Sequence, residues 1–305
     1  MSRNRMRTLV FAYWNRPEKA AYLFVAPSLL VLILFTYVPV LSAVGISLFN
    51  LNMFFQNTQF AGLNNYLKAW QDTRVWNSFG NTFLFALGEV PLQVLFGLCV
   101  AAMVSGNSLF NRLMRSAFFI PVICSLTSIG IIWSLILDAN IGIIPYCFQK
   151  LGLGKPLFLK DPNMAMLIII LLTVWKNFGH TMVILMAGIQ AINPAYYEAA
   201  QVEGASRLKQ FLSITIPLLT PNIAFCAVTN LIGSMQVFDQ VYVATRGGPM
   251  FRTETAVQYI YGRAFSAPFQ LGYASAIAVA LFVIIMVCSL LLNRWFINRE
   301  EGIYA

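Results

Sequence analysis

Six long apolar blocks, separated by short polar segments, dominate the pattern of this sequence. Their boundaries are 20–49, 79–104, 117–137, 164–189, 223–244 and 273–292. Each block has about 20 or more residues, the length that an α-helix needs to cross the hydrocarbon core of a bilayer. A backbone inside lipid must satisfy its own hydrogen bonds, so we expect each block to form a helix, with kinks at Pro27 and Pro39 in the first. The pattern therefore predicts an all-α, polytopic membrane protein with six transmembrane helices.

The composition also indicates a membrane protein. Of the 305 residues, 59% are hydrophobic and 10% are charged, whereas a soluble domain carries about 25% charged residues. No polar segment is long enough for an independently folded domain. None contains the Gly-x-x-x-x-Gly-Lys-Ser/Thr pattern of a P-loop. The soluble and disordered classes are therefore excluded, and so is ATP hydrolysis by the P-loop route.

The distribution of Lys and Arg favours cytoplasmic termini. Five basic residues precede the first block: Arg3, Arg5, Arg7, Arg16 and Lys19. Positive charges near a first helix tend to stay in the cytoplasm. We therefore expect a cytoplasmic tail at 1–19, a membrane domain at 20–294 and a second cytoplasmic tail at 295–305, with the segment 190–222 on the same side. The net charge of +9 reflects this topology, and we expect no nucleic-acid partner.

Polar side chains interrupt the fourth block. Thr173, Asn177 and His180 recur at spacings of four and three residues, so they share one face of a helix, and Trp175 lies among them. Lys176 is in the same block, where a charge costs about 3 kcal/mol at the helix centre. This helix therefore needs protein neighbours. Two interpretations stay open: the stripe lines a path for a hydroxylated solute, or it forms hydrogen bonds between helices.

The fifth block carries a second polar stripe. Asn230 and Ser234 are four residues apart, and Gly233 leaves space beside them. The same two interpretations apply to this pair. Asp239 follows near the outer end of the block, where we expect it to pair with Arg246.

Three further observations concern chemistry. Glu89 lies beside Pro91 in the second block and is interpreted as a structural contact at a helix break. His180 is the only histidine, so a site with several histidine ligands is not available and we expect no metal. The five cysteines form no Cys-x-x-Cys pair and are interpreted as small buried hydrophobes. We expect no catalytic residue and no cofactor bound by this chain.

The segment between the fourth and fifth blocks has the most specific pattern. Asn193 followed by Pro194 is typical of a helix start, and Gly204 predicts the end of that helix. Ser206 can cap a second helix that runs towards Pro217. Four small residues would let another surface approach closely: Ala199, Ala200, Gly204 and Ala205. The residues alone fit either an ordinary amphipathic helix or an element that docks into a partner's groove.

A family resemblance bears on this choice. The pattern Glu198-Ala199-Ala200-x3-Gly204-x9-Ile214-x2-Pro217 resembles the EAA loop of permease subunits of ATP-binding-cassette importers. Ile216 stands where leucine is usual and Glu203 where aspartate is frequent, and both replacements keep shape and charge. The similarity covers nearly the whole chain. Segments 60–66 and 245–249 are similar to the carbohydrate branch, the maltose-type first permease.

The resemblance implies a machine of several subunits in the cell (inner) membrane of a bacterium or archaeon. The expected partners are a second permease subunit, two ATPase subunits that hold ATP and Mg, and an extracytoplasmic solute-binding protein. The residues implied in ATPase coupling are Glu198, Ala199, Ala200, Gly204, Ala205 and Pro217. The residues expected along the path of a sugar substrate are Trp175, Asn177, His180, Asn230 and Ser234.

Two rival hypotheses belong to other classes. A self-contained secondary transporter would couple solute to an ion through Lys176, His180 or Asp239. A membrane-embedded enzyme would need clustered nucleophile or metal groups inside the spans, which the sequence does not offer. Among substrates, mono- or oligosaccharides fit best, and a polyol or glycerol phosphate stays open.

Overall fold

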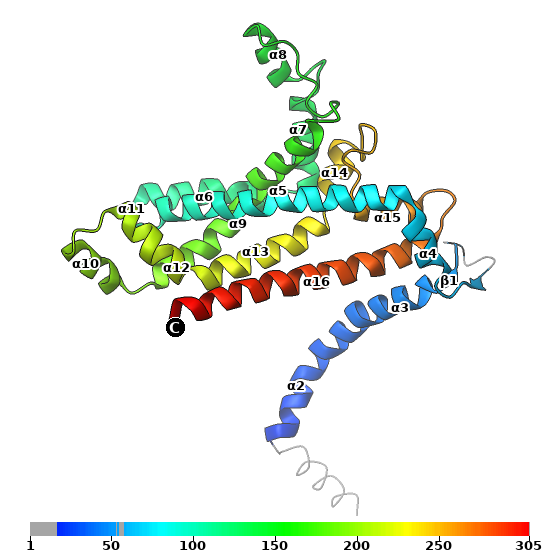
Figure 1. Ribbon diagram of the computed structural model, residues 1–305, viewed down its shortest axis with the longest axis horizontal. Coiled ribbons are helices and arrows are strands. Elements are labelled where there is room, and N and C mark those ends of the chain that lie inside the picture. Colours follow the sequence, from blue (N-terminus) through cyan, green and yellow to red (C-terminus); the bar gives the residue numbers. More distant parts are fainter. Residues whose placement is uncertain (1–16, 53, 55–57, 305) are drawn as a thin grey trace, which may run out of the picture.

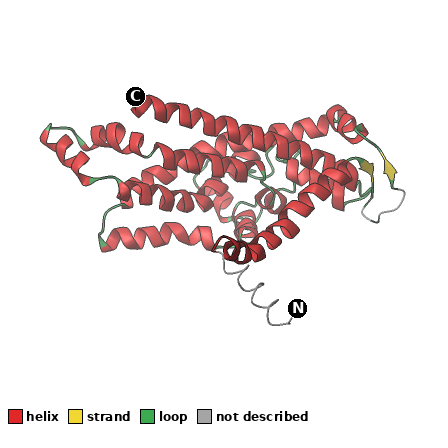
Figure 2. Cartoon of the chain, turned by 90° about the horizontal axis from the view of Figure 1, so that it is seen from below, coloured by secondary structure: helices red, strands yellow, loops and turns green. Residues whose placement is uncertain are grey.

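The part of the chain that is described in the computed structural model comprises residues 17–52, 54 and 58–304. Most of the expected tail 1–19 therefore lies outside the described residues. Figure 2 shows that helices make up almost all of the structure. The exception is a short antiparallel pair, β1 (Phe49–Asn50) and β2 (Gln59–Phe60). The expected all-α class is confirmed, with this strand pair as an addition.

Among the described residues, four helical stretches are long and apolar enough to cross a membrane, or up to six if each of two bent helix pairs is one span. Three of the four are single helices: α5 (Thr73–Val104), α9 (Ala165–Ala191) and α16 (Leu271–Tyr304). They contain the second, fourth and sixth apolar blocks almost entirely. α5 continues through Pro91 without a break, so the expected helix break beside Glu89 is wrong.

The first stretch is built from α2 (Pro17–Leu32), the π-helical turn η1 (Ile33–Tyr37) and α3 (Val38–Ser47). The wide turn follows from Pro39, because proline has no N–H and its ring clashes with the carbonyl four residues earlier. The chain responds with a bond across five residues, from the Val38 N–H to the Ile33 carbonyl. The kink expected at this proline is therefore a π-bulge.

The two bent pairs correct the third and fifth predicted spans. The third consists of α6 (Leu109–Ile123) and α7 (Leu126–Ile136), which meet at 94°. Pro121 weakens the last turn of α6, and Cys124 and Ser125 then adopt extended backbone. An apolar block does not reveal a change of direction, so the sequence pattern predicts one helix over 117–137 where the structure has two.

The fifth predicted span, 223–244, is divided as well. α13 (Thr220–Met235) ends before α14 (Asp239–Ala244) begins. On its other side α13 meets the helical segment Arg207–Leu218 at 66°. That segment contains α11 (Arg207–Gln210), the π-turn η2 (Phe211–Thr215) and α12 (Ile216–Leu218), with Pro217 following the π-turn as Pro39 follows η1.

The centre of the bundle is formed by α5, α9 and α13. α5 and α9 pack closely along their length, and α13 packs against both. A Cβ added at Gly97 of α5 would lie 2.7 Å from Thr181 Cγ2 of α9, so glycine is required for this approach. Phe85, Met182 and Leu185 are fully buried in the same interior. α16 packs against α13 on one side and α3 on the other.

The long axis of the molecule has two different ends (Figure 1). At one end lie the strand pair, α4 (Asn64–Gln71) and α15 (Ala256–Phe265). At the other lie α10 (Pro194–Val202), α11 and the end of α16. The predicted coupling segment and the C-terminal end of the chain thus occupy the same end. α7 and α8 (Ile143–Lys150) project sideways from the bundle.

Candidate functional site

A polar cavity of about 550 Å³ lies where the three central helices meet the two helix breaks. α5, α9 and α13 supply most of its wall, and α6, α7 and α14 complete it. Four of the five residues expected along a solute path line this cavity: Asn177, His180, Asn230 and Ser234. The structure therefore brings both predicted stripes together around one space.

Trp175 is not part of this lining. Its ring packs edge-on against Trp133 of α7, with centroids 5.5 Å apart. Residues two apart on a helix point about 200° away from each other, so Trp175 faces away from the stripe formed by Thr173 and Asn177. The expectation that Trp175 lies beside the stripe therefore does not agree with the geometry of an α-helix.

Hydrogen bonds join the three central helices beside the cavity. Ser234 Oγ of α13 donates to Glu89 Oε2 of α5 at 2.5 Å. Gln93 Nε2 of α5 donates to Asn230 Oδ1 at 3.0 Å, and Asn230 Nδ2 donates to Thr181 Oγ1 of α9 at 3.2 Å. Asn230 and Ser234 therefore form the hydrogen bonds between helices that one of the two interpretations expected. They line the cavity and also hold the helices together.

Glu89 and Gln93 line the cavity, although the sequence pattern placed neither on the solute path. Both side chains are 3% exposed, and both line the cavity. Their spacing of four residues placed them on one face of α5. The sequence contains this spacing, but a helix break at Pro91 would have placed Glu89 and Gln93 on different helical segments.

Lys176 supports the bend between α6 and α7. Its Nζ donates to the Val122 carbonyl at 3.2 Å. In a continuous helix that carbonyl would accept from a backbone N–H four residues later, and the bend removes this partner. The ammonium replaces it, and the side chain is 7% exposed. Lys176 therefore has a structural role in shaping the cavity wall.

The expected pair between Asp239 and Arg246 is not formed. Among the described residues, the ion pairs are Arg74–Glu254, Lys160–Asp138 and Arg263–Asp72. Asp239 begins α14 and Arg246 follows its end, so the helix rise separates the two by about 10 Å. Asp239 lines the polar cavity instead.

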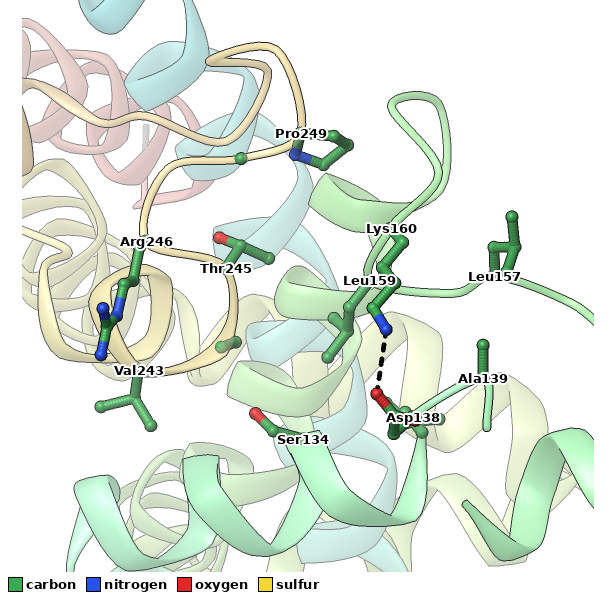
Figure 3. Close-up of a pocket in the computed structure, with 13 residues that line it drawn as sticks. Ser134, Asp138, Ala139, Leu157, Leu159, Lys160, Val243, Thr245, Arg246 and Pro249 are labelled. Carbon is green, nitrogen blue, oxygen red and sulfur yellow. Dashed lines mark hydrogen bonds and ion pairs between the residues drawn. The ribbon is translucent and has the colours of Figure 1, made fainter. Parts of the chain in front are cut away.

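Arg246 borders a second cavity of about 430 Å³, shown in Figure 3. Lys160 and Asp138 form an ion pair of 3.1 Å on one side, and Thr245 and Arg246 lie on the other. Backbone N–H groups at Asn140 and the Lys160 ammonium lower the pKa of Asp138 from its ordinary value. This cavity lies between the end of α7 and the loop after α14, away from the two polar stripes.

A clamp at the end with α4 joins parts of the chain that are distant in sequence. Arg74 makes two bonds of 2.7 Å to Glu254, and its guanidinium lies 3.8 Å from the Phe251 ring centroid. Asn81 Nδ2 donates to the Phe251 and Glu254 carbonyls. This clamp fixes the loop after α14 against the start of α5. Nothing in the sequence pattern pointed to it.

Asp72 ties three elements together at the same end. It caps α5 by accepting from the Arg74 N–H at 2.9 Å, and it accepts from the hydroxyls of Tyr259 at 2.5 Å and Tyr273 at 2.7 Å. Burial alone would raise the pKa of Asp72. The hydrogen bonds and the Arg263 charge outweigh burial and lower the pKa below its ordinary value.

The predicted geometry of the segment 190–222 is confirmed. Asn193 Oδ1 accepts from the Ala195 N–H at 3.0 Å at the start of α10. Gly204 follows that helix with φ +77°, a conformation that favours glycine. Ser206 Oγ then caps α11 by accepting from the Lys209 N–H at 3.3 Å. Two short helices joined by a tight bend result, as expected.

α10 is attached to the membrane domain and leaves one face open. Tyr197 Oη and Thr215 Oγ1, 2.9 Å apart, connect it to η2. Glu198 and Ala199 are exposed, and Val202 is 90% exposed. Ala200 and Ala205 are partly covered, and Gly204 is exposed at the bend. The segment therefore presents a small-residue surface with one carboxylate, next to the helix that leads into α13.

No group of three or more His, Cys, Asp or Glu side chains that could hold a metal ion occurs in the part of the chain that the structure describes.

Comparison with known families identifies the protein class. Residues 93–301 match the family described as binding-protein-dependent transport system inner membrane component. The chain belongs to this family. It is a multi-pass permease subunit of an ATP-binding-cassette importer, and ATP hydrolysis resides on separate subunits, as expected from the sequence.

Similar proteins cover almost the entire chain. The "Probable ABC transporter permease protein YurN" of Bacillus subtilis is 32% identical, over 94% of this chain and 99% of that protein. The lactose transport system permease protein LacF of Rhizobium radiobacter is 31% identical, over 92% of this chain and 94% of that protein. A crystal structure of a bacterial transporter for the acidic polysaccharide alginate has the same fold. The superposition covers 95% of this chain and 98% of the matched chain of that transporter, with 22% sequence identity and a TM-score of 0.79.

Proposed function

We propose that this chain forms half of the path of an ATP-driven sugar importer. The observation that carries the proposal is the polar cavity lined by Asn177, His180, Asn230 and Ser234. Amide, hydroxyl and imidazole groups form hydrogen bonds with sugar hydroxyls. The name of the similar permease LacF refers to lactose, which supports a sugar as the solute.

A second permease subunit completes the cavity. His180 and Asp239 line it and are exposed. Polar and charged groups at membrane depth face protein or water, because contact with lipid is costly. A second permease on this side covers both groups and encloses the solute.

The segment 190–222 couples the path to the ATPase subunits. Its exposed face carries Glu198 and Ala199, and Tyr197 anchors it to η2. A displacement of α10 is therefore passed through Pro217 and the 66° bend into α13, which lines the cavity. Two ATPase subunits act on this segment in the cytoplasm, and both chain termini lie on that side. A solute-binding protein delivers sugar at the opposite end.

Co-purification and ATPase measurements test this proposal. The wild-type chain is produced with its candidate second permease, ATPase and solute-binding protein, and compared with Glu198→Ala. We expect the wild type to assemble and to show ATPase activity stimulated by the loaded binding protein. We expect Glu198→Ala to weaken assembly or stimulation about tenfold, the effect of losing one charged hydrogen bond.

The matched control is Asp161→Ala, which removes a carboxylate at a site remote from α10 and should change neither quantity. Solute uptake into liposomes by the chain alone, driven by an ion gradient, would contradict the proposal and favour a secondary transporter.

A further inference from the structure

The polar cavity carries more carboxyl groups than ammonium groups, although one similar protein is named as a permease of an sn-glycerol-3-phosphate transport system. It is lined by two carboxyl groups, Glu89 and Asp239, and by one ammonium group, Lys176. An ionised carboxyl group repels an anion. Among the described residues that line the cavity, Lys176 is the only lysine or arginine and so supplies the one fixed positive charge that could attract an acidic solute.

Lys176 is already engaged. Its Nζ donates to the Val122 carbonyl at 3.2 Å and lies 3.5 Å from Asn177 Oδ1. Releasing it for a solute would leave the carbonyl at the helix bend without its partner, which is costly in a buried position. The one ammonium of the lining is therefore held in place by the fold.

α5 contributes hydrogen-bond acceptors instead. Glu89 accepts from Ser234 through Oε2, and this is the one hydrogen bond that its carboxylate makes with the described residues. Gln93 Oε1 is buried and lacks a partner among the described residues. Both side chains line the cavity one helical turn apart. Free acceptors at this spacing suit hydroxyl groups, which donate hydrogen bonds, and do not suit carboxylate or phosphate oxygens.

We propose that Glu89 and Gln93 are solute-contacting residues that make this cavity selective for neutral polyhydroxylated solutes over acidic ones. This inference rests on the proposed function. It adds α5, which carries neither polar stripe, to the helices that contact the solute. The Glu89 carboxylate accepts hydroxyl hydrogens of the sugar, and Gln93 Oε1 accepts another. An acidic sugar or a phosphorylated polyol is rejected because its anion meets Glu89.

The test measures solute binding to the assembled permease and ATPase subunits in nanodiscs, without the solute-binding protein. Saturation-transfer-difference NMR is recorded with neutral probes (lactose, trehalose and glucose) and acidic probes (digalacturonate and glycerol 3-phosphate). We expect the wild type to bind at least one neutral probe about tenfold more tightly than either acidic probe, the scale of a charged hydrogen bond gained or lost.

Two variants and one control show whether Glu89 sets the preference between neutral and acidic probes. Glu89→Gln keeps the shape and should weaken neutral binding about tenfold while reducing discrimination against acidic probes. Glu89→Lys should reverse the preference. Asp161→Asn removes a carboxylate outside the cavity and should behave like the wild type. Basal ATPase activity shows that each assembly is intact, and a general loss of structure would not reverse a preference.

Acidic probes binding as tightly as neutral ones would overturn the inference, as would Glu89→Gln with unchanged selectivity in an intact assembly. If neither kind of probe binds, the inference is also wrong, and ATP-dependent stimulation by a loaded binding protein would show that the proposed function survives. The comparison of probes on the wild type decides the question even if a variant fails to assemble.

Discussion

The Lys176 ammonium of α9 donates a hydrogen bond to the Val122 carbonyl of α6, 3.2 Å away. This contact joins the central bundle to the end of a helix that then turns by 94° into α7. A buried charge that would be costly in a straight transmembrane span thus has a partner, because the bend exposes a carbonyl. α7 lines the same cavity through Leu126.

Lys176→Met should destabilise the bend. Loss of a hydrogen bond to a charged group costs about 1.5–3 kcal/mol, and the Val122 carbonyl would lack its donor. Spin labels at the exposed positions Leu113 and Ile132 would measure the distance between α6 and α7, and we expect a broader distribution in the variant. Lys176→Arg keeps a donor and should restore the narrow distribution. An unchanged distribution in Lys176→Met would show that the bend is held by other contacts.

Gly97→Ala should weaken the packing of α5 on α9. The added Cβ would lie 2.7 Å from Thr181 Cγ2 and 3.2 Å from the Met182 backbone nitrogen, so the helices must separate. Overpacking of this kind costs about 1–3 kcal/mol, and we expect a lower thermal unfolding temperature by intrinsic tryptophan fluorescence. Gly80→Ala on the same helix is the control, because nothing lies within 4 Å of its added Cβ. Equal effects of the two substitutions would contradict this account.

Asp72 should make stability depend on acid pH. Its pKa is lowered in the folded protein, mainly because the hydrogen bonds from Tyr259 and Tyr273 outweigh burial. A lowered pKa means that the stabilisation is fully present above the unfolded pKa of about 3.9 and is lost as the pH falls through the folded value. The unfolding temperature of Asp72→Asn should therefore lie below that of the wild type at pH 7, and the gap should narrow below about pH 4.

Asp161→Asn provides the comparison for this pH series, since it removes a carboxylate that is not bonded to tyrosines. A gap between Asp72→Asn and the wild type that stays constant from pH 7 to pH 3 would show that the charge of Asp72 does not contribute.

Features set by neighbouring residues agree with the sequence-based predictions better than features set by contacts between distant helices. The caps at Asn193 and Ser206 and the turn at Gly204 depend on residues within a few positions of each other, and all three were predicted correctly. The long spans were predicted because each consists of consecutive apolar residues. Trp175 was misplaced although helical geometry was sufficient to place it. The structural contact expected at Glu89 is formed, with Ser234, whereas the helix break expected beside it is absent because neighbouring helices support α5 at Pro91.

The sequence by itself determined the membrane class, the two short helices of segment 190–222 and the two polar stripes that line the cavity, since these follow from local periodicity and capping. Only the tertiary structure decided where helices bend and which polar groups meet. Ser234 and Glu89 are 145 positions apart, and Arg74 and Glu254 are 180 apart. Such pairs form because burial leaves each polar group only the partners that packing brings within hydrogen-bond distance. The Lys176 contact likewise exists only because α6 ends beside α9.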